Sequence, residues 1–234
     1  MNHFYKNNLA NLFALLLSLI SANVAFAQPR EGYDYVRLKQ AQPVSTSADQ
    51  VEVLEAFSYA CGGCANFEPM LQIWKSRAPA QVKLVRLPIA WNAPWEVFAR
   101  AYYGSEALGV AEKTHVPLFD ALFKQGKTYK TLEDLSSFYA NYGIKPADFL
   151  KVTKSFAVNS KVARSKQLAP RYEIDGTPTL IVAGKYKVTT DQQKKIGQPE
   201  MLKTLDFLVQ KELLERKASQ TNVVPAALTS PVKK

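Results

Sequence analysis

Residues that bind metal ions are scarce in this chain of 234 residues, which has two cysteines and two histidines. A structural zinc site needs about four ligands, and neither His3 nor His115 lies near a second cysteine pair. Covalent attachment of haem would require a histidine directly after Cys64, where the chain has Ala65 instead. We therefore expect neither a metal site nor a cofactor.

The apolar stretch near the N-terminus is short. Residues 12–20 form an apolar run of nine, whereas a helix needs roughly 20 to cross a bilayer. The run follows Lys6 and precedes Ala-Phe-Ala at residues 25–27, a small-x-small pattern typical of signal-peptide cleavage. No cysteine lies near this pattern, which argues against a lipoprotein. We expect residues 1–27 to be a cleaved signal peptide and the mature chain to begin at Gln28, in an oxidising compartment.

Acidic residues are fewer than basic ones, 20 against 30, which gives a formal net charge of +10. The basic residues recur along 124–130, 151–166 and 185–217, interleaved with apolar residues. Because no single dense basic stretch or base-stacking motif is present, this spread favours solvated helix faces over nucleic-acid binding. Affinity for anionic membrane surfaces or for acidic clients stays open.

The two cysteines, Cys61 and Cys64, are separated only by Gly62 and Gly63. If a helix begins at the glycines, the Cys61 sulfur lies at its N-terminus, where free backbone N–H groups and the helix dipole stabilise a thiolate. The three-residue offset brings the Cys64 sulfur within reach, so that it can resolve a mixed disulfide. A purely structural disulfide is the alternative, but so small a loop would give little entropic stabilisation. We predict a redox-active dithiol.

The context of the pair supports redox chemistry. The mostly apolar run Val51–Phe57 predicts a strand before it. The helix predicted after it, residues 65–76, places Phe67, Leu71 and Trp74 at helical spacing. Strand, Cys-x-x-Cys and helix in this order are typical of a redox site and not of a metal site.

The remaining pattern splits a strand-containing half with a helical segment. After an extended lead-in at 33–38 and the elements above, we predict a strand at 81–89, helices at 97–108, 116–124, 131–142, 146–159 and 160–172, strands at 178–182 and 185–188 around the turn Ala183-Gly184, and a helix at 198–217. This order predicts an α/β core that holds an all-α helical insert. The Ser-, Thr-, Pro- and Lys-rich residues 219–234 are expected to be a disordered tail.

Two segments resemble a known family. Residues 57–68, Phe-Ser-Tyr-Ala-Cys-Gly-Gly-Cys-Ala-Asn-Phe-Glu, resemble the active-site segment of the DsbA family of periplasmic thiol:disulfide interchange proteins. A second match lies at 176–180, Gly-Thr-Pro-Thr-Leu, and 184–186, Gly-Lys-Tyr. The resemblance extends over about residues 33–217. It implies a thioredoxin-like fold, with a central mixed sheet flanked by helices, interrupted by an inserted helical domain.

The same resemblance implies the domain bounds and the cellular location. Residues 28–91 and 173–218 would form the thioredoxin-like domain, and residues 92–172 the inserted helical domain. The mature protein would lie in the periplasm.

The resemblance also implies roles for residues near the dithiol. Cys61 matches the nucleophile and Cys64 the resolving thiol. Pro178 matches the cis-proline that packs against the dithiol, and Thr177 presents its backbone to an incoming peptide. Without the family, Pro178 would be expected to be trans, since cis bonds are about 5–6% of X-Pro bonds.

Three charged residues match a network beneath the active site of this family. Glu55 matches a buried acid whose pKa is raised by desolvation and which shuttles the Cys64 proton. The alternative is an ordinary exposed strand residue, which its apolar flanks disfavour. Glu68 and Arg86 match a Glu and a Lys that join this network, with an exposed salt bridge of little energetic value as the alternative.

The chain departs from the family at two positions. DsbA has Pro-His between its cysteines, and Gly62-Gly63 removes the histidine that would stabilise the Cys61 thiolate. DsbA has a thiol pKa of about 3.5 and a potential of about −120 mV, against about −270 mV for thioredoxin. We therefore predict a weaker oxidant than DsbA.

Thr177 stands where Val is frequent in the family, and Thr is familiar from the related disulfide isomerases.

The resemblance implies an oxidase that donates its disulfide to newly exported, reduced proteins and is reoxidised by a DsbB-like membrane quinone reductase. We expect a monomer that binds no nucleic acid. A reductase or isomerase is the second hypothesis, favoured by Gly62-Gly63 and Thr177, although only residues 28–50 precede the fold where dimeric isomerases carry a dimerisation domain. The third is a chaperone or assembly factor with secondary redox activity.

Overall fold

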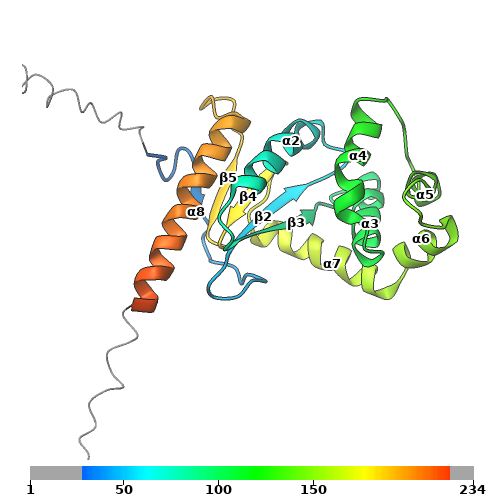
Figure 1. Ribbon diagram of the computed structural model, residues 1–234. Coiled ribbons are helices and arrows are strands. Elements are labelled where there is room, and N and C mark those ends of the chain that lie inside the picture. Colours follow the sequence, from blue (N-terminus) through cyan, green and yellow to red (C-terminus); the bar gives the residue numbers. More distant parts are fainter. Residues whose placement is uncertain (1–27, 222–234) are drawn as a thin grey trace, which may run out of the picture.

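The computed structural model describes residues 28–221 and is built around a mixed β-sheet (Figure 1). Its strands are β1 (Val36–Arg37), β2 (Val51–Phe57), β3 (Val82–Pro88), β4 (Thr179–Val182) and β5 (Tyr186–Thr189). Its helices are α2 (Gly62–Arg77), α3 (Ala93–Ala107), α4 (Ala111–Phe123), α5 (Leu132–Ala140), α6 (Pro146–Thr153), α7 (Phe156–Arg171) and α8 (Gln198–Thr221). The α/β core with its helical insertion agrees with the sequence pattern, and the fold is thioredoxin-like, as the family resemblance implies.

The strand order is β1-β5-β4-β2-β3, with β2 and β3 parallel and the other pairs antiparallel. Every residue of β2 is buried, which fits a strand covered on both faces. Because β4 runs antiparallel to β2 with Ala56 opposite Thr179, the start of β4 lies beside the end of β2. This register brings Thr177 and Pro178 to the segment that leads into Cys61.

Helices cover both faces of the sheet. On one face, α2 and α8 pack against β2, β4 and β5 through a core that includes Phe67, Leu180 and Leu205. On the other face, the end of α7 packs against Leu54 and Ile181. The buried sheet supplies a rigid platform for the residues at its edge.

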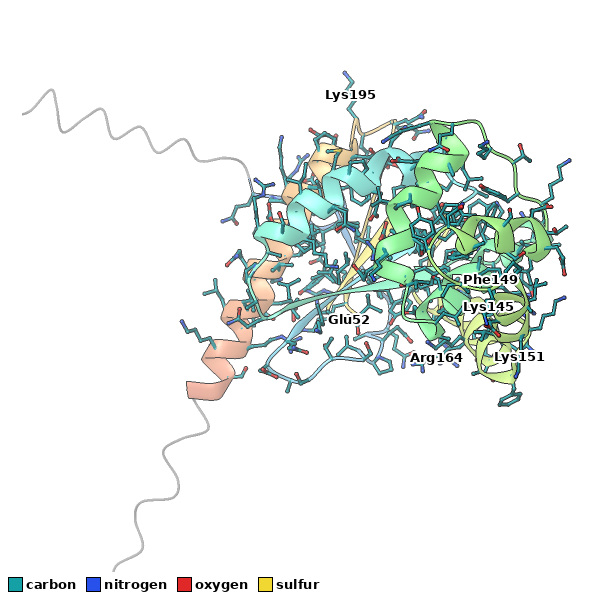
Figure 2. All side chains as sticks on the ribbon, turned by 45° about the vertical axis from the view of Figure 1, so that its right-hand side comes forward. Glu52, Lys145, Phe149, Lys151, Arg164 and Lys195 are labelled. Carbon is teal, nitrogen blue, oxygen red and sulfur yellow. The ribbon has the colours of Figure 1, made fainter. Side chains whose placement is uncertain are left out.

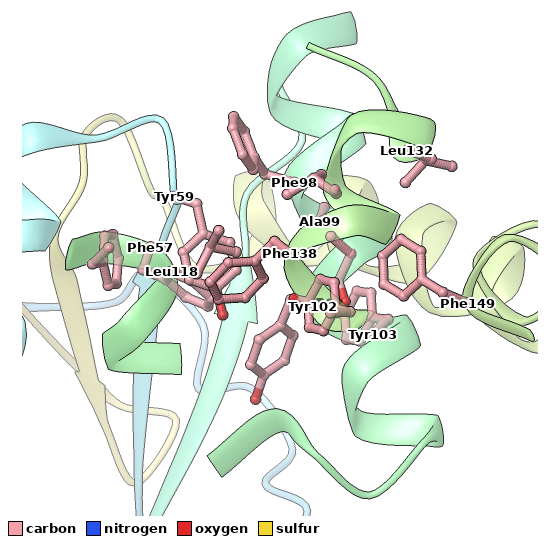
Figure 3. Close-up of a cluster of buried hydrophobic side chains, with 14 of the residues drawn as sticks. Phe57, Tyr59, Phe98, Ala99, Tyr102, Tyr103, Leu118, Leu132, Phe138 and Phe149 are labelled. Atoms are coloured by element: carbon pink, nitrogen blue, oxygen red, sulfur yellow. Dashed lines mark hydrogen bonds between the residues drawn. The ribbon is translucent and has the colours of Figure 1, made fainter. Parts of the chain in front are cut away.

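The helices α3 to α7 lie between β3 and β4 in the chain; α3 to α6 gather at one end of the sheet, and α7 runs back along it (Figure 1). Their core includes two residues from the sheet side, Phe57 and Tyr59, which are both fully buried. Figure 3 shows these two rings beside Leu118, with the cluster continuing through Tyr102 to Phe149. The helical insertion therefore packs directly onto the segment between β2 and the cysteines.

Two helix boundaries differ from the predicted ones. The helix predicted over 146–159 is two helices, because α6 ends at Thr153 and Ser155 caps α7 by accepting a hydrogen bond from the Val158 N–H. The helix predicted from 116 begins at Ala111 instead, so Pro117 lies inside α4 and not near its start. No glycine or proline marks the break between α6 and α7, and Pro117 lies inside α4 without ending it. Glycine and proline were therefore misleading guides to these helix ends.

The ends of the chain need one correction. The predicted disordered tail, 219–234, is wrong for residues 219–221, which continue α8. Residues 222–234 and the predicted signal peptide, 1–27, lie outside the described residues. Within residues 28–221, no helix carries an apolar stretch long enough to cross a membrane.

Basic side chains are distributed over the described surface. In Figure 2, Lys195 projects at one end of the molecule while Lys145, Lys151 and Arg164 lie at the other. Several lysines are paired with acids, such as Lys161 with Glu106 at 3.0 Å. The arrangement fits the solvated helix faces expected from the sequence.

Candidate active site

Cys61 is the N-cap residue of α2, with extended backbone angles (φ −104°, ψ 110°). Its Sγ accepts a hydrogen bond from the Cys64 N–H at 3.1 Å and lies 3.4 Å from the carbonyl oxygen of Thr177. Hydrogen bonds from the Cys64 thiol, the Thr177 side chain and the N–H groups of Cys64 and Gly63 outweigh partial burial and lower the pKa of Cys61 to about 6. The thiolate is therefore the main form of Cys61 at pH 7.

Cys64 lies in the first turn of α2 and is fully buried. Burial raises its pKa, and the hydrogen bond to Cys61 raises it further. Both thiols are free in this structure, which therefore describes the reduced form. The partly exposed sulfur is the acidic one and the buried sulfur holds its proton, an arrangement that suits one nucleophile and one resolving thiol.

Gly62 and Gly63 form the first turn of α2 and are contacted from both parts of the fold. A Cβ atom at Gly62 would lie 3.4 Å from the Phe123 ring, and one at Gly63 would lie 3.4 Å from Pro178. The Gln198 side-chain amide donates to the Gly63 carbonyl at 2.7 Å. Both glycine positions have room for a Cβ atom at ordinary contact distance, so the backbone does not require glycine there.

The Thr177–Pro178 peptide bond is cis. It precedes β4, and the β2–β4 register sets it beside the dithiol. The Thr177 carbonyl contacts the Cys61 sulfur, while Pro178 faces Gly63. The structure thus brings together two segments that are more than one hundred residues apart in the chain.

Glu55, Glu68 and Arg86 form a buried ion network. Arg86 is directly opposite Glu55 in the parallel β2–β3 pair, and its Nε donates to Glu55 at 3.2 Å. Another Arg86 nitrogen donates to Glu68, on α2, at 2.9 Å. The side chains are 3% exposed or less. The alternatives of an exposed strand residue and an exposed salt bridge are therefore wrong.

The neighbours of the two buried carboxyls in this network give them opposite acidities. Burial, followed by the charge of Glu68, raises the pKa of Glu55 to about 8 against the attraction of Arg86. Burial also acts to raise the pKa of Glu68, but His115, Arg86 and Gln72 outweigh it, so the pKa of Glu68 is lowered. One buried carboxyl is therefore protonated at neutral pH beside one that is ionised.

Three contacts of the site were not predicted from the sequence, those of His115, Phe123 and Gln198. His115 is 1% exposed, and its Nε2 lies 3.3 Å from Glu68. Phe123 ends α4 and Gln198 begins α8, far from the dithiol in the chain. His115 precedes the helix predicted at 116–124, and no local pattern in the sequence indicates the contact that it makes with Glu68.

The donor set of Glu55, Glu68 and His115 would suit a metal ion, since one ligand atom of each lies within 4.8 Å of the others. Arg86, however, already donates to both carboxylates and places a fixed positive charge among them. A cation would be repelled from this position. The cluster is therefore built to hold protons.

Comparison with known proteins agrees with this geometry. A sequence model described as the DSBA-like thioredoxin domain matches residues 92–198. The chain is 35% identical over 216 residues to the thiol:disulfide interchange protein DsbA of Pseudomonas syringae pv. tomato, covering 92% of this chain and 100% of that protein. It is 36% identical over 181 residues to the protein of the same name from Pseudomonas aeruginosa, covering 77% and 84%.

Solved structures show the same likeness. The crystal structure of the oxidoreductase DsbA from Xylella fastidiosa matches with a TM-score of 0.72 and 32% identity, over 76% of this chain and 95% of that one. The crystal structure of Pseudomonas aeruginosa DsbA matches with a TM-score of 0.72 and 35% identity, over 82% and 96%.

Proposed function

Because this chain belongs to the DsbA family of thiol:disulfide interchange proteins, we propose that it is the periplasmic oxidoreductase that donates the Cys61–Cys64 disulfide to newly exported proteins. The observation that carries the proposal is the placement of the two sulfurs: Cys61 caps α2 and accepts from the Cys64 N–H, whereas Cys64 is fully buried. A stabilised Cys61 thiolate is a good leaving group, so the mixed disulfide with a client breaks in favour of client oxidation.

The reaction balances with the groups of this site. A client thiolate attacks Sγ of Cys61, the Cys61–Cys64 bond breaks, and Cys64 leaves with the electron pair and takes the proton of Glu55. A second client thiolate then attacks the client sulfur, and Cys61 leaves as the thiolate. The client is oxidised and the dithiol is reduced. A DsbB-like membrane quinone reductase would accept the two electrons and restore the disulfide.

Pro178 and Thr177 are proposed to hold the client segment during this exchange. The Thr177 backbone is adjacent to the Cys61 sulfur, so an extended peptide bonded to Cys61 lies along it. Pro178 packs against Gly63 and keeps the segment against the dithiol.

The oxidising strength is proposed to lie below that of DsbA. Gly62-Gly63 supplies no side-chain donor to the Cys61 thiolate. The pKa of Cys61, about 6, lies between the values of about 3.5 for DsbA and about 7 for thioredoxin. A thiolate of intermediate stability corresponds to an intermediate potential, because stabilising the reduced form is what makes a disulfide oxidising.

The oxidase proposal is tested by mixing the oxidised protein with a reduced, unfolded client and following loss of client thiols. We expect stoichiometric oxidation by the wild-type protein and none by Cys61→Ser. If the protein fails to oxidise the client but reduces or rearranges client disulfides, it is a reductase or an isomerase and the oxidase proposal is wrong. If Cys61→Ser still suppresses client aggregation while exchange is lost, chaperone binding is the separate activity.

A further inference from the structure

His115 connects the helical insertion to the ion network beneath the dithiol. It lies on α4, yet its ring packs against Phe57 and Tyr59, which belong to the end of β2 and the segment after it. The centroid of the His115 ring lies 4.9 Å from that of Phe57 and 5.2 Å from that of Tyr59. Phe119 contacts the ring from the same helix at 5.2 Å. This titratable side chain has no role in the reaction steps described above.

The partners of the His115 ring determine which imidazole nitrogen carries the proton. The Tyr59 hydroxyl is 2.8 Å from Nδ1 of His115. Burial raises the pKa of Tyr59, so the hydroxyl is protonated. Burial also lowers the pKa of His115, which keeps the imidazole neutral. Because the ionised Glu68 that faces Nε2 can only accept, we assign the single N–H to Nε2, and Nδ1 then accepts from Tyr59.

The two carboxylates differ in their donors. Oε1 of Glu68 accepts from Arg86 at 2.9 Å and from Gln72 at 2.6 Å, and its Oε2 lies 3.3 Å from Nε2 of His115. That last pair is aligned poorly for a hydrogen bond, and neither atom has another partner in the described part of the chain. Oε2 of Glu55 accepts a hydrogen bond from Arg86, while its buried Oε1 has no hydrogen-bond partner among the described residues. Glu68 therefore has N–H groups facing both of its oxygens, from Arg86 and Gln72 on Oε1 and from His115 on Oε2, whereas Glu55 has a donor on one oxygen only.

We propose that His115 is a positioning residue for thiol–disulfide exchange, whose Nε2–H keeps Glu68 ionised and thereby keeps the transferable proton on Glu55. The proposal rests on the oxidoreductase function above. When Cys64 leaves as a thiolate, the proton moves from Oε1 of Glu55 to Sγ of Cys64, and the new Glu55 carboxylate is balanced by Arg86. In the reduced form Glu55 then takes up a proton from solvent, in keeping with its raised pKa, and on reoxidation Cys64 releases its proton.

Several charged or titratable groups act on this cluster and must be considered in any pH profile. They are Glu55 on β2, Arg86 on β3, Glu68 on α2, Tyr59 before α2, Tyr102 on α3, Glu112 on α4 and the Cys61 thiolate. Of these, Glu112 is 70% exposed at its side chain, so solvent screens its effect on Arg86.

The test is a pH titration of the Glu55 and Glu68 carboxyl carbons by ¹³C NMR in the reduced protein, with Glu55→Gln and Glu68→Gln used for assignment. In the wild-type protein we expect Glu55 to titrate near pH 8 and Glu68 to stay ionised through that range. His115→Phe keeps the ring packing but removes both nitrogens. Losing a donor to a carboxylate raises its pKa, so the Glu68 midpoint should rise by about one to two pH units.

Two further variants keep the proposal falsifiable if His115→Phe folds poorly. His115→Gln retains an N–H donor and should restore the wild-type titration. Gln72→Leu removes a donor from the other oxygen of Glu68 and should raise its midpoint in the same direction. Identical Glu68 titrations in the wild-type protein and His115→Phe would overturn the proposal, as would a proton resident on Glu68 in the wild-type protein. The titration uses no client, so it is independent of the oxidase assay.

Discussion

Cys61 and Cys64 are the same residue type three positions apart, yet their surroundings give them opposite acidities. The Cys61 sulfur meets donors at the start of α2, whereas the Cys64 sulfur is buried. The Cys-x-x-Cys spacing was sufficient to predict the nucleophile and its stabilised thiolate. It was not sufficient to predict the contribution of Thr177, which depends on the pairing of β4 with β2.

A histidine at Gly63 should make the disulfide more oxidising. Gly63→His places a donor in the first turn of α2 beside the thiolate, and the position has space for a Cβ atom. We expect the pKa of Cys61 to fall below about 6, with a rise in potential of about 30 mV for each pKa unit. Thiolate absorbance and glutathione equilibration measure both quantities. Gly62→Ala is the control and should leave both the Cys61 pKa and the potential nearly unchanged. An unchanged Cys61 pKa in Gly63→His would show that a histidine there does not stabilise the thiolate.

Removing the Thr177 hydroxyl should make the Cys61 thiolate less stable relative to the thiol. Thr177→Val deletes a hydrogen bond to Cys61, so the pKa of Cys61 should rise by about half to one unit. In the Cys64→Ala background, trapped client complexes should also change in lifetime. Thr189→Val, whose hydroxyl contacts Pro178 and Thr179 but not the sulfurs, serves as control. Unchanged complex lifetimes and pKa would leave Thr177 with a packing role only.

At the level of elements, strand β2 was predicted with its observed bounds, because an apolar run followed by Ser-Tyr-Ala is a strong local signal. The boundaries of α4, α6 and α7 were less predictable. Pro117 is tolerated inside α4, and a single side-chain cap at Ser155 separates two helices without glycine or proline. The early start of α4 matters for the site, because it places His115 on a regular helix that faces the sheet.

The Ser155 cap should contribute measurably to stability. Ser155→Ala removes the acceptor for the Val158 N–H, and loss of an N-cap typically costs about 1 kcal/mol of unfolding free energy. Urea denaturation of the wild-type protein and the variant measures the change. The potential should be unaffected, because the cap is part of the helical insertion and has no contact with the dithiol. Ser137→Ala, an exposed helix serine, is the control; equal stabilities of the two variants would show that the cap carries no energy.

At the scale of the whole molecule, the order of strands and helices predicted a split α/β fold, and the family resemblance assigned its topology. The residues that meet at the dithiol come from α2, from the segment just before β4, and from α4 and α8. Contacts such as Gln198 with Gly63 depend on how α8 lies on the sheet, which no local pattern encodes. Glu55 and Arg86 were predicted as members of one network and Glu55 as buried, while their position directly opposite each other on adjacent strands required the register.

The reduced protein should gain stability over the oxidised protein as the pH rises. The folded-state pKa of Cys61 is lowered from its ordinary value to about 6, so this stabilisation is complete above the unfolded value of about 8.5–9 and is lost as the pH falls through 6. Between those limits the difference in unfolding free energy should grow by up to about 1.4 kcal/mol per pH unit. Denaturation of both forms from pH 5 to pH 9 tests this. Parallel pH profiles for the two forms would contradict it.

The central claim is that this dithiol is oxidising but less so than the one in DsbA. The most direct measurement is the equilibrium potential of the Cys61–Cys64 pair against glutathione, with the Cys61 pKa measured on the same sample. The account predicts a potential between about −120 and about −270 mV and a pKa near 6. A potential at or above about −120 mV, or a Cys61 pKa at the ordinary value of about 8.5, would contradict it.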